Sequence, residues 1–140
     1  MPDTLTRPTP LDFPELSLDS SGLVGAVLGG VPTERFDSLL GALDVSAGEL
    51  ADVLHLAPST LGRRRQRGRF DALESERLVR LAHLVARAVE VMGGVEDART
   101  WLTRPSRALG GATPLQYASV EPGAREVERL LVRLEHGVYS

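Results

Sequence analysis

The chain has 140 residues, about the length of one domain, and its 42% hydrophobic and 25% charged content is typical of a globular protein. It contains neither cysteine nor lysine, so all 16 of its basic residues are arginines. These absences exclude disulfides, iron–sulfur clusters, thiol catalysis, Schiff-base chemistry and the P-loop lysine. No apolar run approaches the roughly 18 residues that span a bilayer, and the first residues do not resemble a secretory leader. We therefore expect a cytoplasmic protein with no membrane partner.

The net charge of −3 is distributed unevenly along the chain. Residues 1–31 carry four acids and one base, whereas residues 32–140 balance 15 acids against 15 bases. The overall composition argues against nonspecific coating of nucleic acid, but one dense basic cluster allows a local phosphate-binding site. The cluster places five arginines in seven positions: Arg63, Arg64, Arg65, Arg67 and Arg69.

The first 31 residues are predicted to form a proline-rich segment outside the main helical body. Four of the nine prolines lie in the first fourteen residues, where each removes a backbone donor. Residues 22–30 are apolar and interrupted by glycines. A phosphate-binding loop would need Gly-Lys-Ser/Thr or Gly-x-Gly-x-x-Gly, and neither is present. We expect this stretch to pack on the helical body as a short docking segment.

From Pro32 onward the pattern predicts helices throughout, without strand pairs or internal repeats. Apolar residues recur at helical spacing, and capping residues, prolines and glycines mark the helix ends. The fold class is therefore all-α. The expected helices lie at 32–43, 46–54, 58–68, 71–93, 95–102, near 114–117 and roughly at 124–136.

The second and third expected helices are short and are joined by a tight turn, His55-Leu56-Ala57. Ala51 is small where two crossing helices must approach closely, and Leu56 and Leu61 can fill the angle between them. This layout predicts a helix-turn-helix, whose second helix enters the major groove with its first residues. The turn position that is normally glycine is His55. Histidine tolerates a positive φ better than most other residues.

The arginine cluster coincides with this unit, which favours DNA binding over the alternative of a solvated charged face. Between Ser59 and Leu73 the only acid is Asp71, so we expect little ion pairing within the segment. The residues expected to contact bases or phosphates are Ser59, Thr60, Arg63, Arg64, Arg65, Arg67 and Arg69.

The sequence offers no constellation for catalysis. His55, His83 and His136 are too far apart for a His-x-x-x-His metal pair, and no serine lies in a Gly-x-Ser-x-Gly elbow. The acid pair Asp71/Glu74 stands at a helix start, where capping explains it. We expect no enzyme, no catalytic residue, no metal and no cofactor.

A homodimer or higher assembly is also expected. Val79, Leu84 and Val91 fall outside the main apolar stripe of the long fourth helix and need cover. Operator-binding helix-turn-helix proteins generally use two copies to recognise two half-sites.

Four segments resemble a known family. They are Pro58-Ser59-Thr60-Leu61-Gly62-Arg63-Arg64-Arg65, residues 74–81 (Glu-Ser-Glu-Arg-Leu-Val-Arg-Leu), residues 101–115 (Trp-Leu-Thr-Arg-Pro-Ser-Arg-Ala-Leu-Gly-Gly-Ala-Thr-Pro-Leu) and the ending Leu134-Glu135-His136-Gly137-Val138-Tyr139-Ser140. On these segments the sequence resembles the Xre/MbcA/ParS-like antitoxins, and more narrowly the Xre antitoxins that are partnered with RES-domain toxins. The resemblance covers roughly residues 32–140.

The resemblance implies a two-part antitoxin. Residues 32–90 would form the helix-turn-helix domain that binds the operon's own promoter, and residues 91–140 would bind and silence an NAD-degrading RES-domain toxin. The carboxy-terminal tail would cover the toxin's active site, although a frayed terminus is the ordinary expectation for last residues. A stand-alone repressor and an adaptor without DNA binding stay open as alternatives. The implied toxin-binding residues are Trp101, Leu131, Leu134, Glu135, His136, Gly137, Val138, Tyr139 and Ser140.

Overall fold

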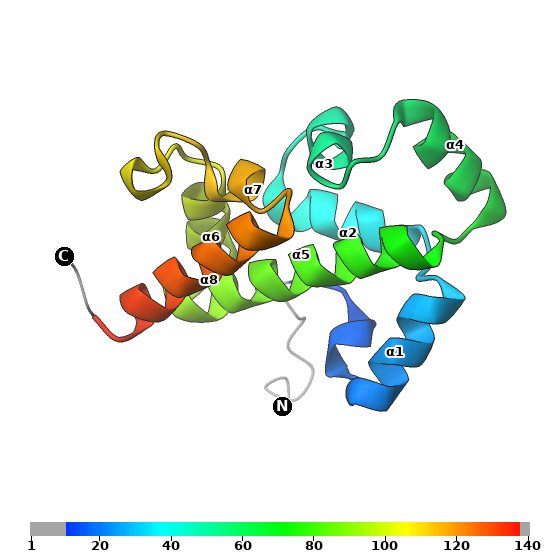
Figure 1. Cartoon of the computed structure of the whole chain (residues 1–140), viewed down its shortest axis with the longest axis horizontal. Helices are drawn as coiled ribbons and strands as arrows, with labels where there is room; N and C mark the ends of the chain where they lie inside the picture. The colour runs from blue at the N-terminus through cyan, green and yellow to red at the C-terminus, as the bar shows by residue number, and fades with distance from the viewer. Residues whose placement is uncertain (1–10, 138–140) are drawn as a thin grey trace, which may run out of the picture.

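The computed structural model describes residues 11–137, and the regular structure in this range is helical (Figure 1). The predicted all-α class is therefore confirmed. Pro32 and Arg69 form an isolated antiparallel bridge. The α-helices are α1 (Ser20–Gly29), α2 (Glu34–Leu43), α3 (Ala47–Val53), α4 (Pro58–Arg67), α5 (Ala72–Met92), α6 (Val95–Leu102), α7 (Pro114–Tyr117) and α8 (Glu121–Glu135), with 3₁₀ turns η1 (Pro14–Ser17) and η2 (Arg107–Leu109).

The long helix α5 is the axis of the fold. It begins where the Asp71 carboxylate accepts the Glu74 N–H at 2.8 Å, while the Glu74 carboxylate accepts the Asp71 N–H at 2.9 Å. This reciprocal capping satisfies two backbone donors at the helix start. It ends at Gly93, whose φ of 88° suits glycine. Helices α1, α2, α6 and α8 all pack on α5, with α1 opposite α2 in Figure 1.

The apolar residues outside the main stripe of α5 are covered within the chain. Val79 and Leu84 are buried, and Val91 is partly buried against the core. Leu23 and Val27 of α1 lie beside Val79. Our premise that these positions need a second copy for cover is therefore wrong, because α1 supplies that cover at Val79.

Helix α1 was not predicted from the sequence, although its segment was expected to pack on the body and does so. The Asp19 carboxylate caps it by accepting the Gly22 N–H at 2.7 Å. Leu11 and Phe13, which precede it, are buried beside Ala86 and Val89 of α5. Residues 11–31 are thus part of the packed structure, and residues 1–10 lie outside the described range.

The last helix begins at Glu121, three residues before the expected start. Pro122 stands in its first turn, where a proline loses no helical hydrogen bond. Gly123 is buried, and a Cβ on it would lie 1.8 Å from the Tyr117 carbonyl oxygen. The crossing of α7 and α8 therefore requires glycine at this position.

Candidate functional site

The α3–α4 unit has helix-turn-helix geometry. Ser46 accepts the Glu49 N–H at 3.1 Å and caps α3, and the Leu56 N–H donates to the Ala51 carbonyl at 2.8 Å to close the turn. Ala51, Leu56 and Leu61 are buried, as expected for residues between the two helices. His55 has a φ of 58°, so it does occupy the left-handed position where glycine is usual.

Arg64 is held by acids on α5 and its cap. Its Nε and Nη2 donate to the two carboxylate oxygens of Glu74 at 2.7 and 3.0 Å, and Asp71 lies 3.5 Å from Nη2. Glu74 is buried. The hydrogen bond to Glu74 raises the pKa of the Arg64 guanidinium above its ordinary value. Arg64 thus fastens α4 to the start of α5 and is not free for DNA in this arrangement.

Arg65 and Arg69 are also held by the body of the protein. Arg65 donates twice to the Asp37 carboxylate, at 3.1 and 3.2 Å, and its guanidinium lies 5.3 Å from the centre of the Phe36 ring. Arg69 donates to the Gly30 carbonyl at 2.7 Å. We expected little ion pairing within residues 59–73, and Asp71 is the one acid of that segment that pairs with the cluster. The expectation did not consider Glu74 and Asp37, which lie outside the segment and hold Arg64 and Arg65.

The remaining two arginines of the cluster, Arg63 and Arg67, are exposed and form no ion pair within residues 11–137. Arg63 Nη2 donates to the Thr60 hydroxyl at 3.3 Å. Gln66 is exposed beside them and was missed by the sequence analysis. The apolar Leu61 could have distinguished these exposed side chains from the inward-facing arginines, because it fixes which face of α4 packs against the protein.

The implied partner-binding residues of the second unit, which comprises residues 91–140, differ in accessibility. Leu131 is fully buried, so the implied partner contact is wrong for this residue. Leu131 instead holds α8 on the core. Trp101 and Leu134 are partly buried, and His136 is exposed. Gly137 turns the chain at the helix end with a φ of 69°. The tail residues Val138, Tyr139 and Ser140 lie outside the described range.

The last turn of α8 is tied to α5. Glu135 pairs with Arg87, which also pairs with Glu90 at 3.1 Å. Hydrogen bonding to Glu135 is the main cause of a raised pKa for the Arg87 guanidinium. The last turn of α8, from which the carboxy-terminal tail continues, is therefore linked to α5 by this ion pair.

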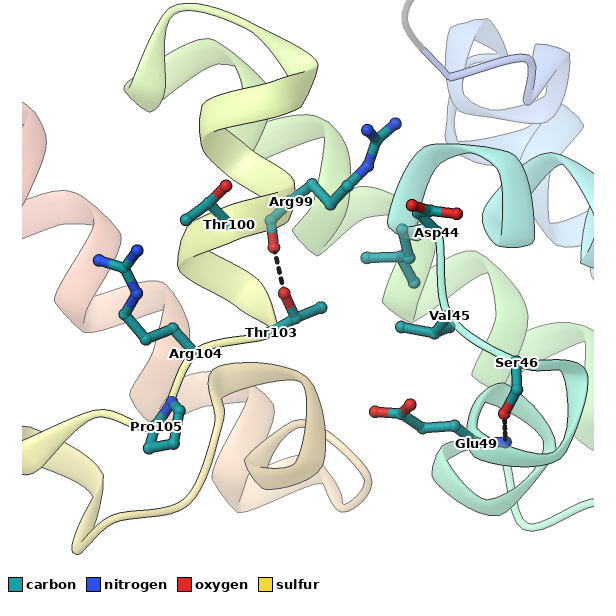
Figure 2. Close-up of a pocket in the computed structure, with 10 residues that line it drawn as sticks. Asp44, Val45, Ser46, Glu49, Arg99, Thr100, Thr103, Arg104 and Pro105 are labelled. Carbon is teal, nitrogen blue, oxygen red and sulfur yellow. Dashed lines mark hydrogen bonds between the residues drawn. The ribbon is translucent and has the colours of Figure 1, made fainter.

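A groove of about 660 Å³ lies along the seam between the helix-turn-helix and the second unit. Figure 2 shows Asp44, Val45, Ser46 and Glu49 on one wall, with Thr100, Thr103, Arg104 and Pro105 on the other. Arg99 closes the seam by donating to the carbonyls of Ala42 and Gly41 at 2.9 and 3.3 Å. Among the residues that the structure describes, no histidine lines the groove.

Residues 11–137 hold neither a cluster of metal-ligand side chains nor a membrane-spanning helix. No three His, Cys, Asp or Glu side chains of this range gather as metal ligands would. None of its helices has the length and apolarity to cross a membrane.

The fold and these surfaces define a helix-turn-helix protein whose second helical unit is packed firmly against the first. Residues 22–83 match the antitoxin Xre-like helix-turn-helix domain, and residues 87–137 match the antitoxin Xre/MbcA/ParS C-terminal toxin-binding domain. The first match begins at Gly22 and so takes in most of α1, which lies before the residues 32–90 expected for the helix-turn-helix domain.

Curated relatives agree with these matches. The chain is 35% identical to Antitoxin Xre of Yersinia enterocolitica over 120 residues, which cover 84% of this chain and 81% of that protein. It is 32% identical to Antitoxin Xre of Photorhabdus laumondii over 79% of this chain and 76% of that one. It is 28% identical to the Prs ADP-ribosylating antitoxin of a Sphingobium species over 84% of this chain and 80% of that one. The chain belongs to the Xre antitoxin family and is an antitoxin of a toxin–antitoxin system.

Proposed function

We propose that this antitoxin neutralises a RES-domain toxin that degrades NAD, and that its carboxy-terminal tail covers the toxin's active site. The observation that carries the proposal is the anchored end of α8. Val127 and Leu131 are fully buried, Glu135 pairs with Arg87, and Gly137 then redirects the chain. A short tail on a fixed base loses little conformational entropy when it enters a pocket.

The chemistry of the tail suits such a pocket. Tyr139 offers a large apolar ring with a polar tip, a type of side chain that often anchors interfaces. The name of the Sphingobium relative refers to ADP-ribosylation, a reaction compatible with an NAD-consuming partner. Around the tail, the proposed contact residues are Trp101, Leu134, Glu135, His136 and Gly137.

We further propose that the protein acts in the cytoplasm, has no enzymatic activity itself and represses its own operon. The support for repression is the exposed face of α4, which carries Arg63 and Arg67 beside a closed helix-turn-helix turn. Figure 1 places α4 and the carboxy-terminal end of α8 at opposite ends of the molecule. Promoter DNA and toxin would therefore meet separate surfaces.

Operator binding of this kind generally uses two copies of the helix-turn-helix. A groove of about 360 Å³ between α1 and α5 supports a homodimer, because Val24 and Leu28 on its rim are 57% and 70% exposed. Glu76 and Arg80 line the same groove and pair with each other at 3.2 Å, so an apolar partner surface would meet Val24 and Leu28 without facing an unpaired charge of these two residues. Light scattering that gave only the 15.1 kDa monomer at every concentration, with and without toxin, would contradict this assembly.

The experiment for tail insertion compares the full-length antitoxin with a variant that lacks residues 138–140. Each is co-expressed with the RES-type toxin, and growth, cellular NAD and co-purification with toxin are measured. We expect the truncated protein to fold and to bind toxin, because α8 keeps its buried contacts, but to restore NAD poorly. Full restoration of NAD by the truncated protein would show that inhibition comes from another part of the interface.

A further inference from the structure

We propose that one face of α4, made of Ser59, Arg63 and Gln66, recognises base pairs in the operator, and that Arg63 binds a guanine while Thr60 positions it. Arg64, Arg65 and Arg69 then serve the fold instead of the DNA. This inference rests on the proposed binding of promoter DNA. The five arginines of the cluster therefore form two groups, one that contacts DNA and one that stabilises the fold.

The register of α4 separates the two groups. Leu61 is buried and marks the inward direction. With roughly 100° between successive residues, Ser59, Arg63 and Gln66 fall within about 40° of the outward direction. Arg64 and Arg65 fall within about 60° of Leu61 by the same arithmetic, which is why they reach α5 and α2. Ser59, Arg63 and Gln66 are all exposed.

The contacts of the inward group leave few donors for DNA. Arg64 donates from Nε and Nη2 to the buried Glu74, and Arg65 donates from both terminal nitrogens to Asp37. Moving either guanidinium to a base edge would break a two-point ion pair, and for Arg64 it would leave a buried carboxylate without its partner. Arg69 is bonded to the Gly30 carbonyl. These three side chains are therefore committed within the protein.

Arg63 has the opposite situation. Its single described hydrogen bond, to the Thr60 hydroxyl at 3.3 Å, uses one of five guanidinium N–H donors. The remaining donors include a pair with the spacing that O6 and N7 of guanine accept in the major groove. The bond to Thr60 limits the rotamers of a long side chain before DNA arrives, so less entropy is lost on binding.

Gln66 and Arg67 complete the surface. Gln66 lies one turn after Arg63 on the same face, and its amide can pair with N6 and N7 of adenine. Arg67 is exposed but lies about 60° to the side of the outward direction, which suits a phosphate on the groove wall. Mutation of Arg67 should therefore weaken binding equally on all sequences.

The test measures binding of the full-length protein to its promoter fragment and to a series in which each base pair of the half-site is replaced in turn. We expect one guanine whose replacement weakens wild-type binding by about tenfold or more. Arg63→Ala should equalise affinity for the four base pairs at that position while discrimination elsewhere is kept. Arg67→Ala is the matched control and should lower all affinities alike, with a shallower salt dependence.

Two variants test the positioning role of Thr60. Thr60→Ser keeps the hydroxyl and should keep the guanine preference, whereas Thr60→Val should reduce it without lowering thermal stability. Unchanged base preferences in Arg63→Ala, or loss of them in a folded Arg64→Ala protein instead, would overturn the inference while repression stands. If the wild-type protein does not bind its promoter at all, the proposed repression fails as well, and the adaptor alternative is correct.

Discussion

The Nε2 atom of His55 lies 2.7 Å from the carbonyl oxygen of Ser119, which ties the helix-turn-helix turn to the α7–α8 junction. Because a carbonyl only accepts hydrogen bonds, Nε2 carries the proton and donates. The same residue has a φ of 58°, a conformation that favours glycine. We infer that the bond to the second unit offsets the backbone strain of a histidine at this turn.

Substitution of His55 separates the bond from the strain. His55→Ala loses the bond and keeps the unfavourable φ. We expect its free energy of unfolding to be about 1 kcal/mol lower than that of wild type. His55→Gly loses the same bond but relieves the strain, so it should be more stable than His55→Ala by about 1 kcal/mol. Urea denaturation of the three proteins measures both differences. Equal stability of wild type and His55→Ala would mean that the bond contributes nothing.

The ion pair between Glu74 and Arg64 should stabilise the docking of α4. Glu74→Gln is the sharpest variant, because the glutamine oxygen can still accept the Asp71 N–H in the cap, whereas the charge and one of the two acceptors for Arg64 are lost. Since Glu74 is buried, we expect a loss of about 2 kcal/mol in the free energy of unfolding. Glu76→Gln, in an exposed pair with Arg80, is the control and should cost at most about 0.5 kcal/mol. Equal effects of the two changes would refute the assignment of Arg64 to the fold.

Features of the fold that depend on local signals are predictable from the sequence. The ends of α5 followed from Asp71 and Gly93, since caps act within one turn. Helix α1 did not follow, because its glycines lower helix propensity and packing on α5 compensates. The partners of Arg64 and Arg65 were missed because the sequence of an arginine cluster does not indicate which acids from other helices lie beside it in the fold. Asp37 is 28 residues away from Arg65.

A glycine-to-alanine pair tests the packing of the second unit. In Gly123→Ala the new Cβ would meet the Tyr117 carbonyl oxygen at 1.8 Å, so α7 must move away from α8. We expect a loss of about 3 kcal/mol in stability and weaker binding of toxin. In Gly41→Ala, within α2, the Cβ meets nothing within 4 Å, and the change should raise stability by up to about 1 kcal/mol. A neutral Gly123→Ala would mean that the α7–α8 crossing is not needed as described.

The pair between Glu135 and Arg87 should matter more for neutralisation than for folding. Both side chains are partly open to solvent, so Glu135→Ala should leave the thermal midpoint nearly unchanged. It should nevertheless loosen the last turn of α8, from which the tail continues after Gly137. A looser base makes insertion of the tail entropically more costly, and we expect several-fold more antitoxin to be needed for half-maximal protection of NAD in a titration against purified toxin. Glu121→Ala removes a comparable exposed pair, with Arg125, at the other end of α8 and is the matched control. If both variants protect NAD as well as wild type, the fixed base of the tail has no part in inhibition; if both lose protection together, α8 acts as a docking surface along its whole length.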